Sequence, residues 1–348
     1  MNEFHPILKK DFEKLVSEDY IQWDNLGNAT FFITGATGLI GSLITKTLLY
    51  YRRKKGTNTK IYILARDREK AMEMYGDKPV QIIWGDVRQP FDIEGKLDYI
   101  IHAASVTTSR YMITNPVETL MTSIIGTDNV LNLAREKAVK SVVYLSSMEV
   151  YGVTTEEMNP ITEEKLGFLD IHNVRSSYSE GKRACELLCT SYASEYGVPV
   201  KIARLAQTFG AGVRENESKV YASFAKSAIK KENIILHTRG ESQGNYCYTA
   251  DAVGALLCLL TKGEPGEAYN VVNESSSMKI KEIASLIAEK HGCKVVFEIP
   301  VGNVYGYAPE SKMRLSGKKI ESLGWNPSVG IEEMYDRMTA IWDTSKIL

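Results

Sequence analysis

The 348-residue sequence predicts an α/β fold, a doubly wound parallel sheet with helices on both faces and a smaller lobe toward its C-terminal end. Up to about residue 208, apolar runs of strand length alternate with helical patterns. The strand runs are apolar almost throughout, as strands buried on both faces must be. Beyond that point the loops lengthen and short helical patterns interrupt them, which marks the smaller lobe.

The individual elements follow from local patterns. Residues 1–28 place Ile7, Phe12 and Leu15 at helical spacing, which predicts a helical N-terminal extension. The predicted strands are 29–35, 60–65, 80–86, 97–105, 141–147 and 199–207. The predicted helices are 36–51, 67–76, 115–138, 177–196, 219–231 and 278–292. We expect one domain over 29–208 and the smaller lobe over 209–348.

Composition and charge exclude several function classes. The 42 Lys and Arg residues balance 43 Asp and Glu residues, so no basic field attracts nucleic acid. No run approaches the ~18 apolar residues of a membrane-spanning helix, and the charged N-terminus has no apolar signal segment. The five Cys and five His residues are scattered without metal-ligand spacing. We therefore expect a cytoplasmic protein without a nucleic-acid partner, a membrane partner or a metal.

A glycine-rich turn, "TGATGLIG", joins the first strand of the sheet to a helix. Glycine lets the backbone approach an anionic pyrophosphate, and a helix N-terminus offers free N–H groups and a partial positive charge. The turn follows a strand and opens a helix, which is the context in which this pattern predicts dinucleotide binding. The residues that we expect at the cofactor are Gly35, Thr37, Gly38, Leu39, Ile40 and Gly41.

The ends of the next three strands supply further cofactor residues. Arg66 comes directly off the second strand, where an arginine accommodates a 2′-phosphate and an acidic residue binds a ribose hydroxyl. Arg66 favours NADP, whereas Asp67 beside it favours NAD, so NAD stays an alternative. Asp86 and Val87 follow the third strand and are placed to line an adenine pocket. The fourth strand ends beside the expected cofactor at Ala103, Ala104 and Ser105.

Tyr178 and Lys182 lie at positions i and i+4 of a predicted helix and hence on one face of it. A free tyrosine has a pKa of ~10, which is too high for a base at neutral pH. A lysine ammonium and an oxidised nicotinamide ring both favour the phenolate. The tyrosine can then take a proton from a substrate hydroxyl while hydride leaves the same carbon. We expect both residues to contact the cofactor and to act in catalysis.

The segments "TGATGLIG", "HAAS", "LSSMEVYG" and "YSEGK" occur in an order and spacing that resemble the extended short-chain dehydrogenase/reductase family. Within it, the chain resembles the nucleotide-sugar epimerase/dehydratase group and is most similar to UDP-glucuronate decarboxylases. The resemblance implies a Rossmann-type domain over 29–208, a substrate-binding lobe over 209–348, and a homodimer formed through a helix bundle. It also implies that Ser147 is the hydroxyl partner of Tyr178 and Lys182 in catalysis.

Met148 and Glu149 depart from the patterns of the family's main activities. Members that resemble 4,6-dehydratases carry Asp then Glu at these two positions, decarboxylases carry Ser then Glu, and 4-epimerases usually carry small or neutral residues. Methionine has no useful proton to donate, whereas Glu149 can still accept one. Three interpretations stay open: Glu149 removes a proton next to a transient ketone, it binds a sugar hydroxyl, or it is structural.

The phosphate-binding residues of the family are also altered in this sequence. Gly244 or Asn245 stands where members carry an arginine that contacts the diphosphate. Arg239 and Arg314 are candidate substitutes, and Gln207 replaces a usual asparagine. The residues that we expect at the substrate are Arg110, Ser147, Met148 and Gln207.

The resemblance implies an NAD(P)-dependent nucleotide-sugar epimerase/dehydratase that works through transient oxidation at sugar C4. It further implies a role in the synthesis of cell-surface polysaccharide precursors. Two alternatives stay open. One is an NADPH-dependent reductase of a keto nucleotide sugar, and the other is an enzyme similar to UDP-glucuronate decarboxylases.

Overall fold

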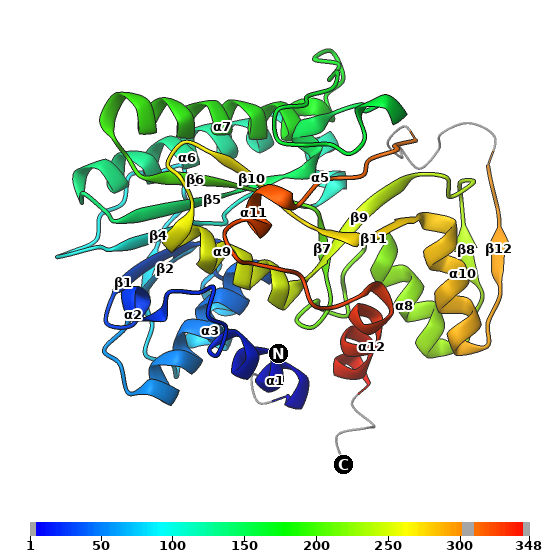
Figure 1. Cartoon of the computed structure of the whole chain (residues 1–348), viewed down its shortest axis with the longest axis horizontal. Coiled ribbons are helices and arrows are strands. Elements are labelled where there is room, and N and C mark those ends of the chain that lie inside the picture. Colours follow the sequence, from blue (N-terminus) through cyan, green and yellow to red (C-terminus); the bar gives the residue numbers. More distant parts are fainter. Residues whose placement is uncertain (1–4, 301–309, 344–348) are drawn as a thin grey trace.

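The computed structural model describes residues 5–300 and 310–343 (Figure 1). Within these residues one sheet has seven parallel strands in the order β10-β6-β5-β4-β1-β2-β3. Its strands are β1 (Thr30–Thr34), β2 (Lys60–Ala65), β3 (Gln81–Trp84), β4 (Tyr99–His102), β5 (Ser141–Ser147), β6 (Val200–Leu205) and β10 (Ala268–Val271). The strand order reverses between β1 and β4, the position at which doubly wound sheets bind their ligands. The predicted doubly wound parallel sheet is therefore confirmed.

Helices cover both faces of this sheet (Figure 1). The helices that follow its strands are α3 (Leu39–Lys55), α4 (Arg68–Tyr75), α5 (Ser109–Thr114), α6 (Pro116–Glu136), α7 (Ser176–Tyr196) and α9 (Thr249–Lys262). Two 3-10 turns, η1 (Met148–Tyr151) and η2 (Glu156–Met158), follow β5. Helices α6 and α7 pack side by side on one face, and α3 and α9 pack on the other.

The core of the α6–α7 face forms as the apolar pattern predicts. Val130, Leu131 and Leu133 of α6 are buried, and they pack in one cluster with Cys185 and Cys189 of α7. Both cysteines are free thiols, which agrees with the absence of a disulfide pattern in the sequence.

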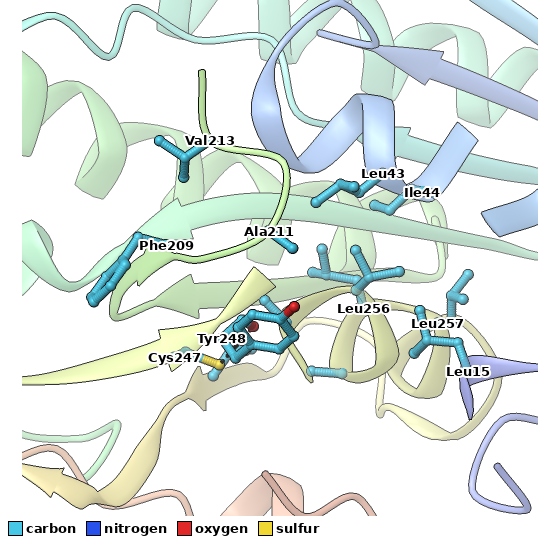
Figure 2. Packing of buried hydrophobic residues seen from close by; sticks show 14 of the residues in the cluster. Leu15, Leu43, Ile44, Phe209, Ala211, Val213, Cys247, Tyr248, Leu256 and Leu257 are labelled. Carbon is cyan, nitrogen blue, oxygen red and sulfur yellow. Dashed lines mark hydrogen bonds between the residues drawn. The ribbon is translucent and has the colours of Figure 1, made fainter. Parts of the chain in front are cut away.

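The opposite face brings together segments that are far apart in the sequence. Figure 2 shows Leu43 and Ile44 of α3 beside Leu256 and Leu257 of α9, with Leu15 of the N-terminal extension next to them. All five side chains are buried. Burial of a Leu or Ile side chain contributes about 1.5–3 kcal/mol. The N-terminal extension is therefore part of the core rather than an appendage.

The predicted helical extension is present as α1 (Pro6–Leu15) and the short α2 (Trp23–Leu26), while its residues 1–4 lie outside the described part. Phe12 and Leu15 are buried as the helical spacing predicts, and Ile7 packs at the edge of the same cluster. The Trp23 indole donates a hydrogen bond to the Leu15 carbonyl (3.0 Å), which ties α2 to the end of α1.

The smaller lobe contains two small sheets and four helices among the described residues. The strands are β7 (Gln207–Phe209), β9 (Gln243–Tyr248) and β11 (Asn273–Lys279) in one sheet, and β8 (Ile234–Leu236) and β12 (Val295–Phe297) in the other. The helices are α8 (Val220–Lys230), α10 (Ile280–His291), α11 (Lys318–Glu321) and α12 (Ile331–Trp342).

The chain does not stay in this lobe after residue 208. Helix α9 returns to cover the large sheet, and β10 then pairs with β6 as its edge strand. The physical reason is that α9 is apolar on nearly all sides, and almost all of its residues are buried. Such a helix must pack against other elements, and the large sheet provides that surface. Within the described residues, no helix is both long and apolar enough to cross a membrane.

Candidate active site

The glycine turn between β1 and α3 is shaped for close approach of backbone atoms. Gly35 has a φ of +68°, and a Cβ built on it would lie 2.6 Å from the backbone of Ala103 at the end of β4. A Cβ on Gly41 would lie 2.4 Å from the Gly35 carbonyl oxygen. Gly38 caps α3 without a side-chain hydrogen bond, so the first helical turn offers its backbone N–H groups. This cradle fits the diphosphate of a dinucleotide cofactor.

The end of β2 carries a positive rather than a negative group. The strand ends at Ala65, and the Asp67 carboxylate caps α4 by accepting from the Lys70 N–H (3.0 Å). The Arg66 side chain is 77% exposed, and its contact with Asp86 is long, 3.5 Å.

Asp86 follows β3 and is held by a neighbour that the sequence did not single out. Arg88 binds its two carboxylate oxygens through Nε and Nη2, each at 3.0 Å. These hydrogen bonds, opposed by burial, lower the pKa of Asp86 to about 2. Val87 beside it is buried against Gly126 of α6. Asp86 and Val87 are thus held in a fixed arrangement after the carboxyl end of β3.

The end of β4 is fixed by a buried histidine. His102 Nδ1 lies 2.7 Å from the Thr34 hydroxyl, and Nε2 lies 3.2 Å from the Thr127 hydroxyl. Burial lowers the pKa of His102 to about 3, so the ring is neutral and structural. Thr34 also accepts from the Ala104 N–H (3.1 Å), which holds Ala103, Ala104 and Ser105 beside the glycine turn.

Ser147, Tyr178 and Lys182 gather at the carboxyl end of β5. Ser147 is the last residue of β5, and its side chain is close enough to Tyr178 to lower the pKa of that phenol. Burial and the charge of Glu149 raise the pKa of Tyr178 to about 12, while Ser147 and Arg175 act in the opposite direction. The Lys182 ammonium lies 5.9 Å from the centre of the Tyr178 ring.

Lys182 itself is buried and held from two sides. Its Nζ donates to the Leu145 carbonyl (2.6 Å) and lies 4.7 Å from the centre of the Tyr144 ring. Burial lowers the pKa of Lys182 to about 8, against the smaller opposing effects of Cys185, Glu186 and Cys189. The structure therefore brings together the three residues that the sequence placed in catalysis.

Glu149 lies in η1, directly after this cluster, and its carboxylate points to the start of α7. Arg175 Nη2 donates to Oε1 at 3.0 Å and forms an ion pair with Oε2 at 2.9 Å, and the Ser179 hydroxyl donates to Oε2 at 3.2 Å. The Glu149 side chain is still 36% exposed. Glu149 is therefore paired by side chains of α7, and a substrate can still reach it.

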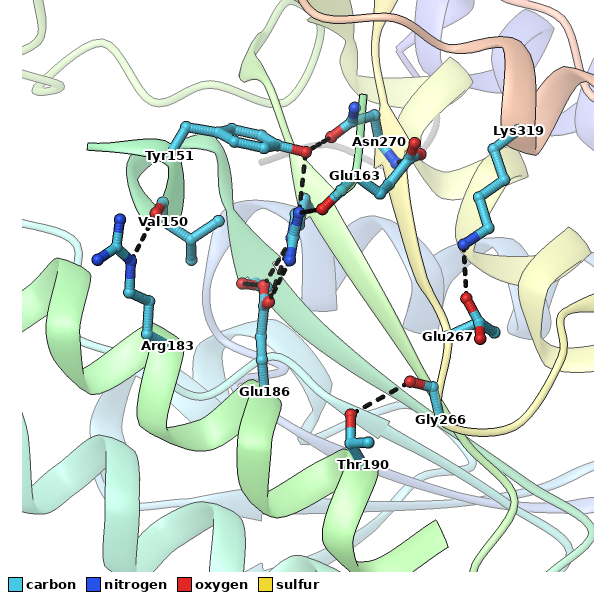
Figure 3. A network of polar contacts seen from close by, with 12 residues as sticks. Val150, Tyr151, Glu163, Arg183, Glu186, Thr190, Gly266, Glu267, Asn270 and Lys319 are labelled. Atoms are coloured by element: carbon cyan, nitrogen blue, oxygen red, sulfur yellow. Dashed lines mark hydrogen bonds and ion pairs between the residues drawn. The ribbon is translucent and has the colours of Figure 1, made fainter. Parts of the chain in front are cut away.

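A buried polar network fixes η1 and α7 relative to the sheet. Arg204 of β6 pairs with Glu186 of α7 (2.7 Å) and donates to the Tyr151 hydroxyl (3.0 Å). Tyr151 in turn donates to Asn270 of β10 (2.6 Å). Figure 3 shows Tyr151, Glu186 and Asn270 arranged around this centre. Because the network spans four elements, it holds Glu149 and Tyr178 at a fixed separation.

The predicted substrate residues are spread more widely. Met148 packs its side chain against the apolar cluster of Val150 and Tyr151, so it fills space beside the site. Arg110 is exposed in α5, after the end of β4. Gln207 begins β7 and pairs with Tyr246 of β9.

The residue at the position of the family's diphosphate-binding arginine and the two candidate substitutes for that arginine lie in different places. Asn245 is buried, donates to the Asn273 carbonyl and accepts from the Leu315 N–H (2.7 Å), so it is structural. Arg314 pairs with Glu156 of η2 (2.6 Å) on the surface, and Arg239 is exposed.

Sequence reasoning missed Arg175 and Arg88. Each lies close in the chain to a residue that was singled out, Tyr178 and Asp86 respectively, and each carries the charge opposite to a nearby carboxylate. No group of three or more His, Cys, Asp or Glu side chains that could hold a metal occurs among the described residues.

Comparison with known proteins gives consistent matches. The model of the NAD dependent epimerase/dehydratase family matches residues 31–272. The chain is similar to UDP-glucuronic acid decarboxylase 6 of Arabidopsis thaliana, with 28% identity over 88% of this chain and 86% of that protein. UDP-glucuronic acid decarboxylase 1 of Xenopus tropicalis is 30% identical over 86% of this chain and 69% of its own length.

Two solved structures share the fold. A UDP-glucose 4-epimerase from Thermotoga maritima, solved with UDP-glucose, has a TM-score of 0.77 at 20% identity and covers 91% of this chain and 99% of its own. A dTDP-glucose 4,6-dehydratase from Streptomyces venezuelae, solved with NAD, has a TM-score of 0.75 at 22% identity and covers 90% and 96%.

Proposed function

Because the chain belongs to the NAD-dependent epimerase/dehydratase family, we propose that it remodels a nucleotide-activated sugar through transient oxidation at sugar C4. The observation that carries this proposal is the cluster of Ser147, Tyr178 and Lys182 at the carboxyl end of β5. It lies on the edge of the sheet that also presents the glycine turn and the end of β4. A hydride acceptor can therefore reach a sugar carbon while a proton acceptor reaches the hydroxyl group on the same carbon.

The roles of the three residues follow from their chemistry. The glycine turn would hold a nicotinamide dinucleotide, which would supply the acceptor for the C4 hydride and its later return. Tyr178, as phenolate, takes the proton of the C4 hydroxyl, and Ser147 hydrogen-bonds the same oxygen. The Lys182 ammonium stabilises the phenolate electrostatically. The C4 ketone then acidifies the proton on C5, which allows chemistry at a carbon that is otherwise unreactive.

Glu149 is the candidate group for that second stage. It follows the catalytic serine by two residues, it is partly exposed, and its Oε1 accepts from Arg175 with a further lone pair available. We favour removal of the C5 proton by Glu149, which leads to elimination or epimerisation. Turnover in deuterated water tests this step, since deuterium at C5 of the product supports it and its absence contradicts it.

A second candidate is decarboxylation of a nucleotide-linked uronic acid. The observation that favours it is the similarity to UDP-glucuronic acid decarboxylases over 86–88% of the chain. A C4 ketone makes loss of the C6 carboxylate easy, because the resulting carbanion is stabilised as an enolate. Met148 weighs against it, since decarboxylases of this family carry a serine at that position.

We propose NADP as the preferred cofactor. Arg66 is exposed at the end of β2, and the Asp67 carboxylate is engaged in capping α4. The cytoplasmic location, the homodimer and the role in polysaccharide precursor synthesis stay predictions.

The decisive experiment is incubation of the purified protein with UDP-, dTDP-, GDP- and CDP-linked sugars, read by mass spectrometry. Loss of water indicates a dehydratase, loss of CO2 a decarboxylase, and a new isomer of equal mass an epimerase. A gain of two hydrogens with stoichiometric consumption of NADPH supports a reductase and contradicts the non-redox proposal.

A further inference from the structure

Arg175 is a charged residue of the site to which the reaction above gives no role. It precedes the first residue of α7 and lies one turn before Tyr178. Its backbone N–H donates to the Asn173 side chain (3.0 Å), and the next hydroxyl, Ser176, donates to the Asp170 carbonyl (2.7 Å). This turn fixes the direction in which the arginine leaves the chain.

The guanidinium of Arg175 reaches two functional groups. Its Nη2 contacts both oxygens of the Glu149 carboxylate, at 3.0 and 2.9 Å, and its Cζ lies 5.8 Å from the centre of the Tyr178 ring. The Arg175 side chain is 27% exposed. The pair is thus partly shielded from water, so its charges act on Tyr178 more strongly than surface charges would.

The two charges act on Tyr178 in opposite directions. Among the described residues, the charged and titratable groups that act on it include Glu149 of η1, Arg175 just before α7, Lys182 of α7 and Tyr144 of β5. After burial, the negative charge of Glu149 is the largest cause that raises the pKa of Tyr178, and Arg175 lowers it. A carboxylate beside the catalytic phenol needs a compensating cation, because two neighbouring anions destabilise each other.

Another arginine, Arg183, already makes the backbone contacts that a purely structural arginine would make here. Arg183, two turns further along α7, donates from Nε to the Val150 carbonyl and from Nη2 to the Gly167 carbonyl, both at 2.7 Å. These bonds attach η1 and the following loop to α7. Arg183 does not contact the Glu149 carboxylate in this arrangement, whereas Arg175 binds that carboxylate and no backbone carbonyl of η1.

We propose that Arg175 is a positioning residue, which holds the Glu149 carboxylate beside the substrate and places a compensating positive charge next to Tyr178. The inference rests on the proposed function, in which Tyr178 is the base at C4. It explains how one small site can contain two proton acceptors. It also assigns to one arginine a link between the C4 step and the C5 step.

The test compares Arg175→Met, Arg175→Lys and Glu149→Gln, with Arg183→Met as the charge-matched control on the same helix. The readout is the phenolate absorption of Tyr178 as a function of pH, taken as the difference between each protein and the same protein carrying Tyr178→Phe. We expect Arg175→Met to raise the midpoint of this titration by about one pH unit and Glu149→Gln to lower it by about as much. We expect the midpoint of the double variant, Arg175→Met with Glu149→Gln, to lie between those of the two single variants. The midpoint of Arg175→Lys should stay near that of the parent protein.

Two outcomes overturn the inference: an unchanged midpoint in Arg175→Met, or an equal rise in Arg183→Met, which would show a merely structural effect. The titration does not depend on turnover, so it tests the role of Arg175 separately from the proposed function. The proposed function is contradicted instead if Tyr178→Phe retains the turnover of the parent protein with the nucleotide sugars. A pH profile of kcat/KM with the sugar that is converted then repeats the comparison in the reaction itself.

Discussion

The side chains around Lys182 show how a single residue sets the conditions for chemistry. Its ammonium is bound to the Leu145 carbonyl and faces the Tyr144 ring, so it cannot move freely toward solvent. Burial lowers its pKa to about 8, below the ordinary value of 10.5. The positive charge that assists Tyr178 is therefore present below about pH 8 and is lost above it, unless the phenolate itself retains the proton on Lys182.

Removal of the Tyr178 hydroxyl tests the assignment of the base. We expect Tyr178→Phe to lower turnover by about 10²–10⁴-fold, the usual contribution of a general acid or base. Tyr196→Phe is a matched control, because Tyr196 lies at the far end of the same helix and packs its ring on Arg135 (3.9 Å). Equal activity of the two variants, measured with the sugar that the enzyme converts, contradicts the role of Tyr178.

We predict that Arg66 decides the preference between the two dinucleotides. Arg66→Ala removes an exposed guanidinium whose contact with Asp86 is long, 3.5 Å, so we expect no loss of folding. The affinity for NADPH falls about tenfold, which corresponds to ~1.4 kcal/mol, while the affinity for NADH is retained. Fluorescence titration with both cofactors measures this. A parallel loss for NADH and NADPH would remove Arg66 from 2′-phosphate recognition.

Among single residues, the sequence alone identified those whose type and spacing are typical of one kind of site. Gly35, Tyr178 and Lys182 are such residues, because few other roles require a glycine turn after a strand or a tyrosine and lysine one helical turn apart. Arg175 was not found, since its importance depends on where Glu149 points, and that direction comes from the tertiary structure. The roles of all these residues stay predictions.

Among the elements, the turn between β1 and α3 is the most constrained by sterics. We expect Gly35→Ala to destabilise the protein more than Gly56→Ala does. Both glycines have left-handed φ values, +68° and +64°, so both variants lose roughly 1–2 kcal/mol to backbone strain. Only at Gly35 would the new Cβ meet backbone atoms, those of Ala103 and Ala104 at 2.6 Å, which adds about 1–3 kcal/mol.

Urea unfolding of the two variants measures the difference, and Gly56→Ala is the control because its Cβ would meet nothing within 4 Å. We also expect cofactor binding to weaken in Gly35→Ala alone. Equal free energies of unfolding in the two variants would show that the turn can move away from β4, contrary to the close packing described here.

The elements of the first domain were largely predictable, and the exceptions have physical causes. The strands of the large sheet up to β6 and the long helices α6 and α7 follow directly from apolar periodicity. The return of α9 and β10 to the sheet did not follow. Helix α9 is buried on nearly all sides, so it has no polar stripe to reveal its orientation, and β10 has only four residues.

For the whole molecule, α1 connects parts that no pattern in the sequence associates. It contacts α3, which begins at the glycine turn, and α9. Its buried Asp11 accepts from the Tyr248 hydroxyl (2.5 Å) and pairs with Arg337 of α12 (2.6 Å). The N-terminal extension thus joins the helices α3 and α9 on one face of the large sheet to α12 of the smaller lobe.

This connection makes stability depend on pH in a defined direction. Burial raises the pKa of Asp11 from 3.8 to about 6, although Tyr248 and Arg337 oppose the rise. Between these values the folded protein binds more protons than the unfolded chain. The contribution of Asp11 to the free energy of unfolding is therefore complete below about pH 4 and is lost as the pH rises through about 6.

Asp11→Asn removes this titration while it keeps an oxygen that can accept from Tyr248 and Arg337. Relative to the parent, the variant should gain about 2–3 kcal/mol in free energy of unfolding between pH 4 and pH 7, because only the parent loses stability over that range. Urea unfolding across this range measures the gain. Asp24→Asn, an exposed substitution in α2 with the same change of charge, is the control and should follow the parent. A difference between Asp11→Asn and the parent that is constant or shrinks with rising pH would mean that the ion pair with Arg337 outweighs burial at this site.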